Sequence, residues 1–204
     1  ATMRHLFDLR FVFKMTTTLT ALKDHQAVMS KMELLIPSIE AAAERMAFAI
    51  QKGGKIFWMG NGGSASDAQH LAAELVGRFK KERRALPSIA LTADSSILTC
   101  LSNDYDFSIV FSRQLEALCT ANDIVVGIST SGNSRNVLKG IETAKSLGAY
   151  TIGFAGQKGQ LADLVDLCLA VPSENTARIQ EAHIFMGHSI CELVEQQFSL
   201  VPAA

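Results

Sequence analysis

KIFWMGNGGSASDAQHLAAE, residues 55–74, joins an apolar run to a glycine-rich turn and then to a stretch with helical spacing. A short apolar run that ends in Gly-Asn-Gly-Gly is typical of a buried strand followed by a tight loop. The turn lacks both the Gly-Lys-Ser/Thr of a P-loop and the spacing of a dinucleotide fingerprint. The stretch therefore predicts a strand, a phosphate-type loop and a helix, with a small phosphorylated metabolite favoured over a nucleoside triphosphate.

The same alternation of apolar runs and helical stretches continues along the chain. The expected strands occupy residues 55–60, 88–93, 123–129, 150–156 and 167–172, and they are apolar enough to be buried on both faces. The expected helices occupy residues 66–79, 95–102, 107–119, 134–147, 158–163 and 176–198. Alternation of this kind with short loops predicts a single doubly wound α/β domain, with a central five-stranded parallel sheet flanked by helices.

Residues 19–52 add N-terminal helices before the first strand, restarted at Pro37 and closed by Gly53 and Gly54. Their apolar stripe is wider than two surface helices need. Packing against the sheet and a subunit interface both explain that width, and the pattern does not choose between them. Residues 1–14, ATMRHLFDLRFVFK, lack the cleavage site of a signal peptide. We assign residues 1–14 to an N-terminal extension without a function, and residues 15–204 to the domain.

Composition excludes several classes of partner. The chain has 19 basic and 20 acidic residues, so it offers no polyanion-binding surface and nucleic acid is disfavoured. No apolar run approaches the ~18 residues that a membrane span requires. The four cysteines have no CxxC spacing, and their apolar sequence surroundings predict buried free thiols in a reducing cytoplasm. They are Cys100, Cys119, Cys168 and Cys191.

A second phosphate-type loop, STSGNS, follows the expected strand at 123–129 and precedes a helix. Its hydroxyl groups, its backbone N–H groups and the positive end of the helix dipole all suit a phosphate monoester, and Arg135 stands next to it. The hydroxyl-bearing residues are Ser129, Thr130, Ser131 and Ser134. An ordinary serine-rich turn with Ser134 as the helix N-cap is the alternative. The presence of the GNGGS loop after another strand favours the phosphate site.

His70 and Glu74 stand four residues apart, one turn apart on the helix that follows GNGGS. The pair can bind a divalent metal, or Glu74 can act as a base oriented by His70. An exposed i,i+4 pair without a function is the third interpretation. In the closing helix, Gln180 and His188 both interrupt an otherwise apolar segment, which is unusual for a helix that only packs.

Four separated motifs resemble a known family in matching order, from about Leu19 to Phe198. They are GNGGSASDAQHLAAELVGRF, SNDYDF, GISTSGNSRNV and ARIQEAHIFMGHSICELVE. Together they resemble the sugar isomerase (SIS) domain, with its flavodoxin-like sheet, and within it the phosphoheptose isomerases. The resemblance implies an aldose–ketose isomerase that converts sedoheptulose 7-phosphate to D-glycero-D-manno-heptose 7-phosphate, the first step of heptose synthesis for lipopolysaccharide or another surface polysaccharide.

The resemblance also implies a role for each matching residue. It places the substrate site at the first loop, at the second motif and at Gln180, namely Asn61, Gly62, Gly63, Ser64, Glu74, Asn103, Asp104 and Gln180. It assigns the phosphate to Ser129, Thr130, Ser131 and Ser134. It implies one zinc ion per subunit, held by His70, Glu74, Gln180 and His188, with Glu74 and His188 as the proton-transfer pair. It further implies a homotetramer with sites at subunit interfaces.

The chemistry expected from the residues agrees with that activity. Conversion of a ketose to an aldose moves a proton between adjacent carbons, for which a carboxylate and an imidazole suffice without a redox cofactor. A zinc ion could polarise the carbonyl or fix the site. One difficulty remains, because a straight helix separates Gln180 and His188 by roughly 12 Å. Both side chains must lean inward, or different subunits must contribute them.

Two other functions are open to a protein of this fold. A related SIS-domain protein binds the bacterial replication initiator and, as the resemblance suggests, lacks an acid and a base at the positions of Glu74 and His188. Because this chain has both residues, the enzyme is favoured. A phosphosugar sensor is the other alternative, but such sensors usually accompany a DNA-binding or nucleotide-binding module.

Overall fold

The computed structural model describes residues 2–199, with side chains from residue 16 onward. Its centre is a parallel sheet of five strands in the order β2-β1-β3-β4-β5. The strands are β1 (Ile56–Gly60), β2 (Ser88–Ala90), β3 (Ile124–Ser129), β4 (Tyr150–Ala155) and β5 (Leu167–Ala170). The expected class of fold and all five expected strands are confirmed. Since β1 and β3 are neighbours, the order reverses between them, where ligands of such sheets collect.

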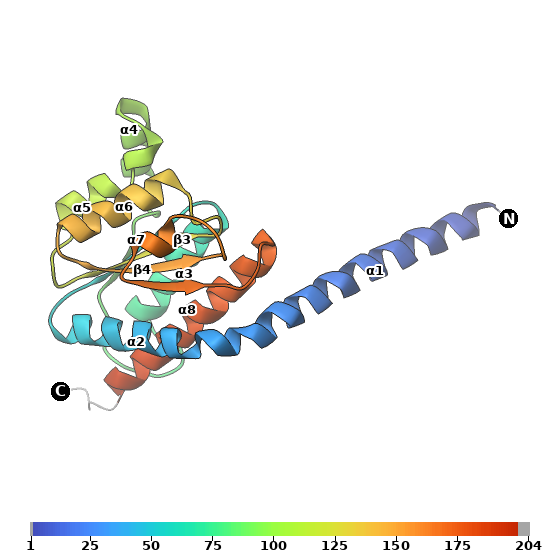
Figure 1. Cartoon of the computed structure of the whole chain (residues 1–204), viewed down its shortest axis with the longest axis horizontal. Coiled ribbons are helices and arrows are strands. Elements are labelled where there is room, and N and C mark those ends of the chain that lie inside the picture. Colours follow the sequence, from blue (N-terminus) through green and yellow to red (C-terminus); the bar gives the residue numbers. More distant parts are fainter. Residues whose placement is uncertain (1, 200–204) are drawn as a thin grey trace.

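Helices cover both faces of this sheet (Figure 1). On one face, α2 (Ile36–Gln51), α3 (Gly63–Val76) and α8 (Thr176–Ser199) pack against residues such as Trp58 and Phe154. On the other face, α5 (Ser112–Leu118), α6 (Arg135–Ser146) and α7 (Leu161–Leu164) pack against residues such as Phe57 and Met59. Successive side chains of a strand point to opposite faces, so β1 supplies both cores.

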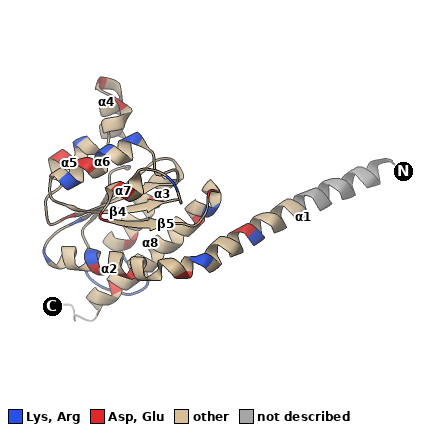
Figure 2. Cartoon of the chain, viewed as in Figure 1, with Lys and Arg blue, Asp and Glu red and all other residues tan. Residues whose placement is uncertain are grey.

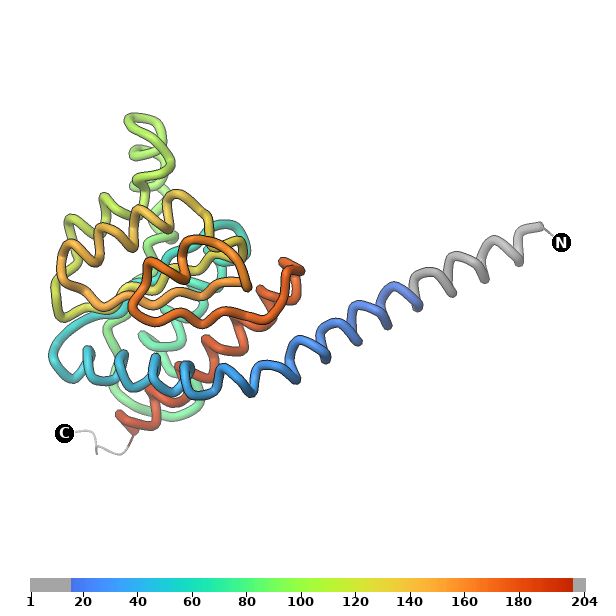
Figure 3. The backbone as a smooth tube through the Cα atoms, viewed as in Figure 1, coloured from blue at the N-terminus to red at the C-terminus, as the bar shows by residue number. Residues whose placement is uncertain are grey.

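The N-terminal helices divide their apolar residues between the core and the surface. α1 (Thr2–Met29) leads into a 3-10 turn at Ser30–Leu35 and then α2, which has Pro37 in its first turn. Apolar side chains of α2 such as Ile39 and Met46 are buried in the core. Leu19 and Leu22, in contrast, are each 50% exposed on the stretch of α1 that extends away from the sheet (Figure 3). Packing therefore accounts for only part of the wide apolar stripe.

The extension assigned to residues 1–14 lies outside the described side chains, so the proposed domain boundary stays a prediction.

Three local expectations are corrected. The range 107–119 is a 3-10 turn at Phe107–Ile109 followed by α5, because Asp106 accepts a bond from the backbone N–H of Ser108 and caps a separate turn. The edge strands β2 and β5 are only partly buried, since each has one neighbour in the sheet. Cys100 is exposed on α4 (Ser95–Asp104), which projects from the body (Figure 1), so it is not a buried thiol.

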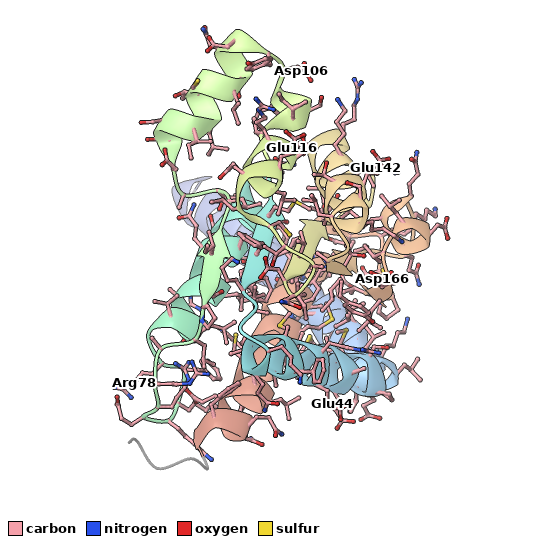
Figure 4. The ribbon with its side chains drawn as sticks, turned by 90° about the vertical axis from the view of Figure 1, so that its left-hand side faces the viewer. Glu44, Arg78, Asp106, Glu116, Glu142 and Asp166 are labelled. Carbon is pink, nitrogen blue, oxygen red and sulfur yellow. The ribbon has the colours of Figure 1, made fainter. Side chains whose placement is uncertain are left out.

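Charged residues of both signs are intermixed over the outer helices and loops (Figure 2). Figure 4 shows labelled examples on the periphery, among them Glu44 on α2 and Glu142 on α6. The intermixing agrees with the net charge of −1. Among the described residues, no helix has both the length and the apolar character needed to cross a bilayer.

Candidate active site

The two phosphate-type loops lie side by side at the point where the strand order reverses. One follows β1 and the other follows β3, and both are at the carboxyl ends of their strands. Gly62, the N-cap of α3, has a φ of 56°, a left-handed conformation that glycine adopts without strain. No side chain caps this helix, so the anion-binding end of α3 opens onto the first loop.

An amide pair that the sequence did not reveal joins the two loops. Asn61 and Asn136 exchange hydrogen bonds, each donating its Nδ2 to the other's Oδ1 over 2.8 Å. Asn136 lies in the first turn of α6 and is 3% exposed. Because the two amides bond to each other, the pair fixes the first loop against the start of α6. The sequence offered only one signal, an asparagine two residues after the serine loop.

The hydroxyls of the second loop gather around the start of α6. Ser129 Oγ lies 2.9 Å from Ser134 Oγ and 3.5 Å from Ser131 Oγ. Ser134 occupies the N-cap position, but its side chain makes no capping bond. The first N–H groups of α6 are thus left without a serine cap, as an anion site requires. This arrangement favours the phosphate interpretation over the ordinary capped turn.

The segment after β4 braces this loop from the other side. The N–H of Gly156 donates to the Thr130 carbonyl, and the N–H of Leu161 donates to the Gly132 carbonyl. Thr130 and Ser131 also line a cavity of about 300 Å³ that reaches Lys158 and the start of α8. The loop is therefore both rigid and open to a ligand.

His70, Glu74 and His188 converge on one point, on the facing sides of α3 and α8. His70 Nε2 lies 2.9 Å from His188 Nε2 and 3.3 Å from Glu74 Oε1. One ligand atom from each of the three residues lies within 4.8 Å of the other two. Two ligands bound tetrahedrally to zinc at 2.0–2.1 Å lie about 3.3 Å apart, so this set of donors fits such an ion.

Burial adjusts the chemistry of one of these groups. The pKa of His188 is lowered, chiefly because burial disfavours the charged imidazolium and also because His70 lies beside it. The Glu74 carboxylate opposes this shift without reversing it. A neutral imidazole is the form that binds a metal.

Gln180 lies on α8, about two turns before His188, and faces the first residues of α3 rather than this cluster. Its side-chain amide rests against Gly63, where an added Cβ would lie 2.7 Å from Gln180 Nε2. α8 is one continuous helix, so nothing bends Gln180 toward His188. One chain thus brings together three of the four expected zinc ligands, and it places Gln180 beside the first loop. Its role as a ligand stays a prediction.

Asn103 and Asp104 lie apart from both loops, at the end of the projecting helix α4. They are exposed, and Asn103 Nδ2 donates to Asp104 Oδ1 over 2.8 Å. Cys100 Sγ contacts the same carboxylate at 3.4 Å. Their contact with a sugar stays a prediction.

The sequence profile of the SIS domain matches residues 22–156. Phosphoheptose isomerase of Aquifex aeolicus (strain VF5) is 56% identical over 165 residues, which cover 80% of this chain and 86% of that protein. The chain belongs to the phosphoheptose isomerase family.

Two phosphoheptose isomerases of known structure agree with this assignment. That of Neisseria gonorrhoeae has a TM-score of 0.84 at 39% identity, covering 89% of this chain and 98% of its own. That of Francisella tularensis has a TM-score of 0.87 at 35% identity, covering 90% and 98%.

Proposed function

We propose that this chain is an aldose–ketose isomerase that converts sedoheptulose 7-phosphate to D-glycero-D-manno-heptose 7-phosphate. The observation that carries the proposal is the convergence of His70, Glu74 and His188 beside two phosphate-type loops, in a member of the phosphoheptose isomerase family. A carboxylate and an imidazole next to an anion site are the groups that this reaction needs. The same pair favours an enzyme over a sensor or a partner-binding protein, because neither of those functions requires an acid and a base.

The reaction would proceed by proton transfer between two carbons. The serine and threonine loop and the start of α6 hold the phosphate, which leaves the carbonyl end of the sugar for the cluster. Glu74 removes the proton from C1 while His188 protonates the oxygen at C2, and an enediol results. Glu74 then returns the proton to C2, and the C1 hydroxyl gives its proton back to His188 as C1 becomes the aldehyde. Atoms and electrons balance without a redox cofactor.

One zinc ion per subunit completes the proposed site. His70, Glu74 and His188 would hold it, with Gln180 as a fourth ligand supplied by a neighbouring subunit. A bound zinc ion would polarise the substrate oxygen or fix the two imidazoles. Support comes from the donor set itself, two imidazoles and a carboxylate at separations that suit tetrahedral zinc.

A homotetramer with shared sites is the proposed assembly. Large apolar side chains that are exposed on the helical segments support association. They include Leu19, Leu22, Leu34, Ile36, Phe48 and Phe185. We place the enzyme in the cytoplasm, with its product directed to heptose precursors of lipopolysaccharide or another surface polysaccharide.

The test is an isomerase assay on metal-analysed protein. Sedoheptulose 7-phosphate should yield the aldose phosphate, with fructose 6-phosphate as the matched six-carbon control that reacts more slowly. In D₂O, proton transfer through an enediol should place deuterium at C2 of the product. Protein that contains zinc and forms no heptose phosphate would rule out the proposed activity.

A further inference from the structure

The aromatic ring of Phe79 lies flat against His188. The two ring centroids are 5.2 Å apart and the planes are inclined by only 24°. Phe79 belongs to the loop of residues 77–84, which follows α3 and returns along α8. Stacking of this kind restricts the rotation of an imidazole about its side-chain bonds. The ring of His188 is therefore oriented by Phe79, and it also contacts the ring of His70.

Glu195 holds this loop in place from inside the protein. Its carboxylate is 1% exposed and accepts bonds from the backbone N–H groups of Phe79, Lys80 and Lys81 at 2.8–3.0 Å. Glu195 follows His188 by seven residues on α8, which places the two on the same stripe two turns apart. Burial alone would raise the pKa of Glu195, but these N–H groups and Arg83 together lower it, so the carboxylate is charged.

Arg83 extends the same network to Glu74. Its side chain is fully buried, with Nε 3.4 Å from Glu195 Oε1. One guanidinium nitrogen donates to the Glu74 carbonyl over 2.8 Å and the other donates to the Gly77 carbonyl over 2.9 Å. Arg78 on the same loop is 62% exposed and is labelled on the periphery in Figure 4. Burial of Arg83 is therefore specific to its place beside Glu195.

We propose that Glu195 is a positioning residue for the active site, which fixes His188 through Phe79 and the last turn of α3 through Arg83. The inference rests on the proposed function, because it concerns the geometry of the groups that would hold zinc and move the proton. A buried carboxylate with three backbone N–H donors is a rigid anchor, and residues that orient metal ligands commonly change metal affinity. A loop that only closed the end of the domain would affect stability but not the affinity for zinc.

Zinc affinity of metal-stripped protein, measured by chelator competition, separates these two roles without the sugar substrate. Phe79→Leu keeps an apolar side chain but removes the flat ring, and we expect its zinc dissociation constant to rise about 10- to 100-fold. Phe79→Tyr keeps the ring and should restore wild-type affinity. Glu195→Gln should weaken zinc binding to a similar extent. Glu192→Gln is the matched control, because its side chain is 40% exposed and its carboxylate pairs with Lys80 of the same loop.

Thermal unfolding of the same metal-free samples shows whether each variant is folded. If Glu195→Gln does not fold, comparison of Phe79→Leu with Phe79→Tyr still tests whether this loop positions His188. Unchanged zinc affinity in Phe79→Leu, or a wild-type protein that binds no zinc, overturns the inference. Weakened zinc binding in a protein that does not isomerise the heptose would uphold the inference and reject the proposed activity alone. In an active enzyme, kcat should fall in Phe79→Leu more than KM rises, since substrate contacts are retained.

Discussion

The Nε2 atoms of His70 and His188 lie 2.9 Å apart, although 118 residues separate the two histidines in the chain. The contact depends on the close packing of α3 and α8. Gly187, directly before His188, lies so near Leu71 that an added Cβ would be 2.5 Å from a Leu71 methyl carbon. A larger residue at position 187 would push the helices apart and separate the two imidazoles. This packing explains how a cluster forms between elements at opposite ends of the chain.

Replacement of Glu74 tests the proton-transfer step. Glu74→Gln retains the shape of the side chain but removes its basicity, so turnover of sedoheptulose 7-phosphate should fall roughly 10²- to 10⁴-fold while the substrate still binds. His188→Asn should have a similar effect, because the imidazole acid is lost. Metal content of each sample is the control, since either change can also release zinc. Wild-type turnover in both variants would contradict the mechanism.

The phosphate loop can be tested at Ser131 and Ser134. Alanine at both positions removes two hydroxyl donors, each worth roughly 1.5–3 kcal/mol when bonded to a charged oxygen, so the substrate dissociation constant should rise at least about tenfold. Calorimetric titration measures it directly. Ser146→Ala, at the far end of α6, is the matched control and should bind normally. If the double variant binds the substrate with wild-type affinity, the phosphate must instead bind at the first loop.

Asn136 should matter for stability and for substrate binding together. In Asn136→Ala the amide of Asn61 loses both its bonds, which should lower the free energy of unfolding by roughly 1–3 kcal/mol. Denaturant titration gives this value, and KM should rise because the two loops are no longer joined. Asn122→Ala, in the exposed turn that precedes β3 at the amino ends of the strands, should change neither. A stable variant with an unchanged KM would show that the pair is dispensable.

His183 should make stability depend on acidity. Burial lowers its pKa from 6.5 to about 4, while its Nε2 donates to the Ala155 carbonyl. Between these values the unfolded chain binds the proton and the folded protein does not, so stability falls as the pH falls from 6.5 to 4. The loss should reach roughly 3 kcal/mol. His183→Gln removes the titration, so denaturant unfolding of the variant should show a smaller loss over this range. Parallel curves for the two proteins would refute the assignment.

The oligomer prediction is tested by mass. Light scattering at micromolar concentration should give a tetramer. Lysine at both Leu19 and Leu22, each 50% exposed, should shift the mass downward if this part of α1 lies in the interface. Asp24→Lys on the same helix is a charge control. A monomeric wild-type protein would remove the basis for a Gln180 ligand from a neighbouring subunit.

The sequence by itself determined the local structure around each motif. Strand positions followed from apolar runs, and helices followed from spacing of three and four, because both patterns record which side of an element meets the core. The loop at STSGNS and the His70–Glu74 pair were also found this way, since their members are neighbours on one turn or one helix face. The resemblance of four motifs to the phosphoheptose isomerases then predicted the isomerase activity, and membership of that family supports it.

Only the tertiary structure decided which distant residues meet. The Asn61–Asn136 pair, the stacking of Phe79 on His188 and the buried partners of Glu195 all join elements whose separation in the chain carries no periodic signal. The tertiary structure also placed Gln180 beside Gly63 rather than beside His188, because α8 is one continuous helix. It placed Asn103 and Asp104 on the projecting helix α4. Such contacts depend on how helices pack over the sheet, and that is set by the shape of the whole core.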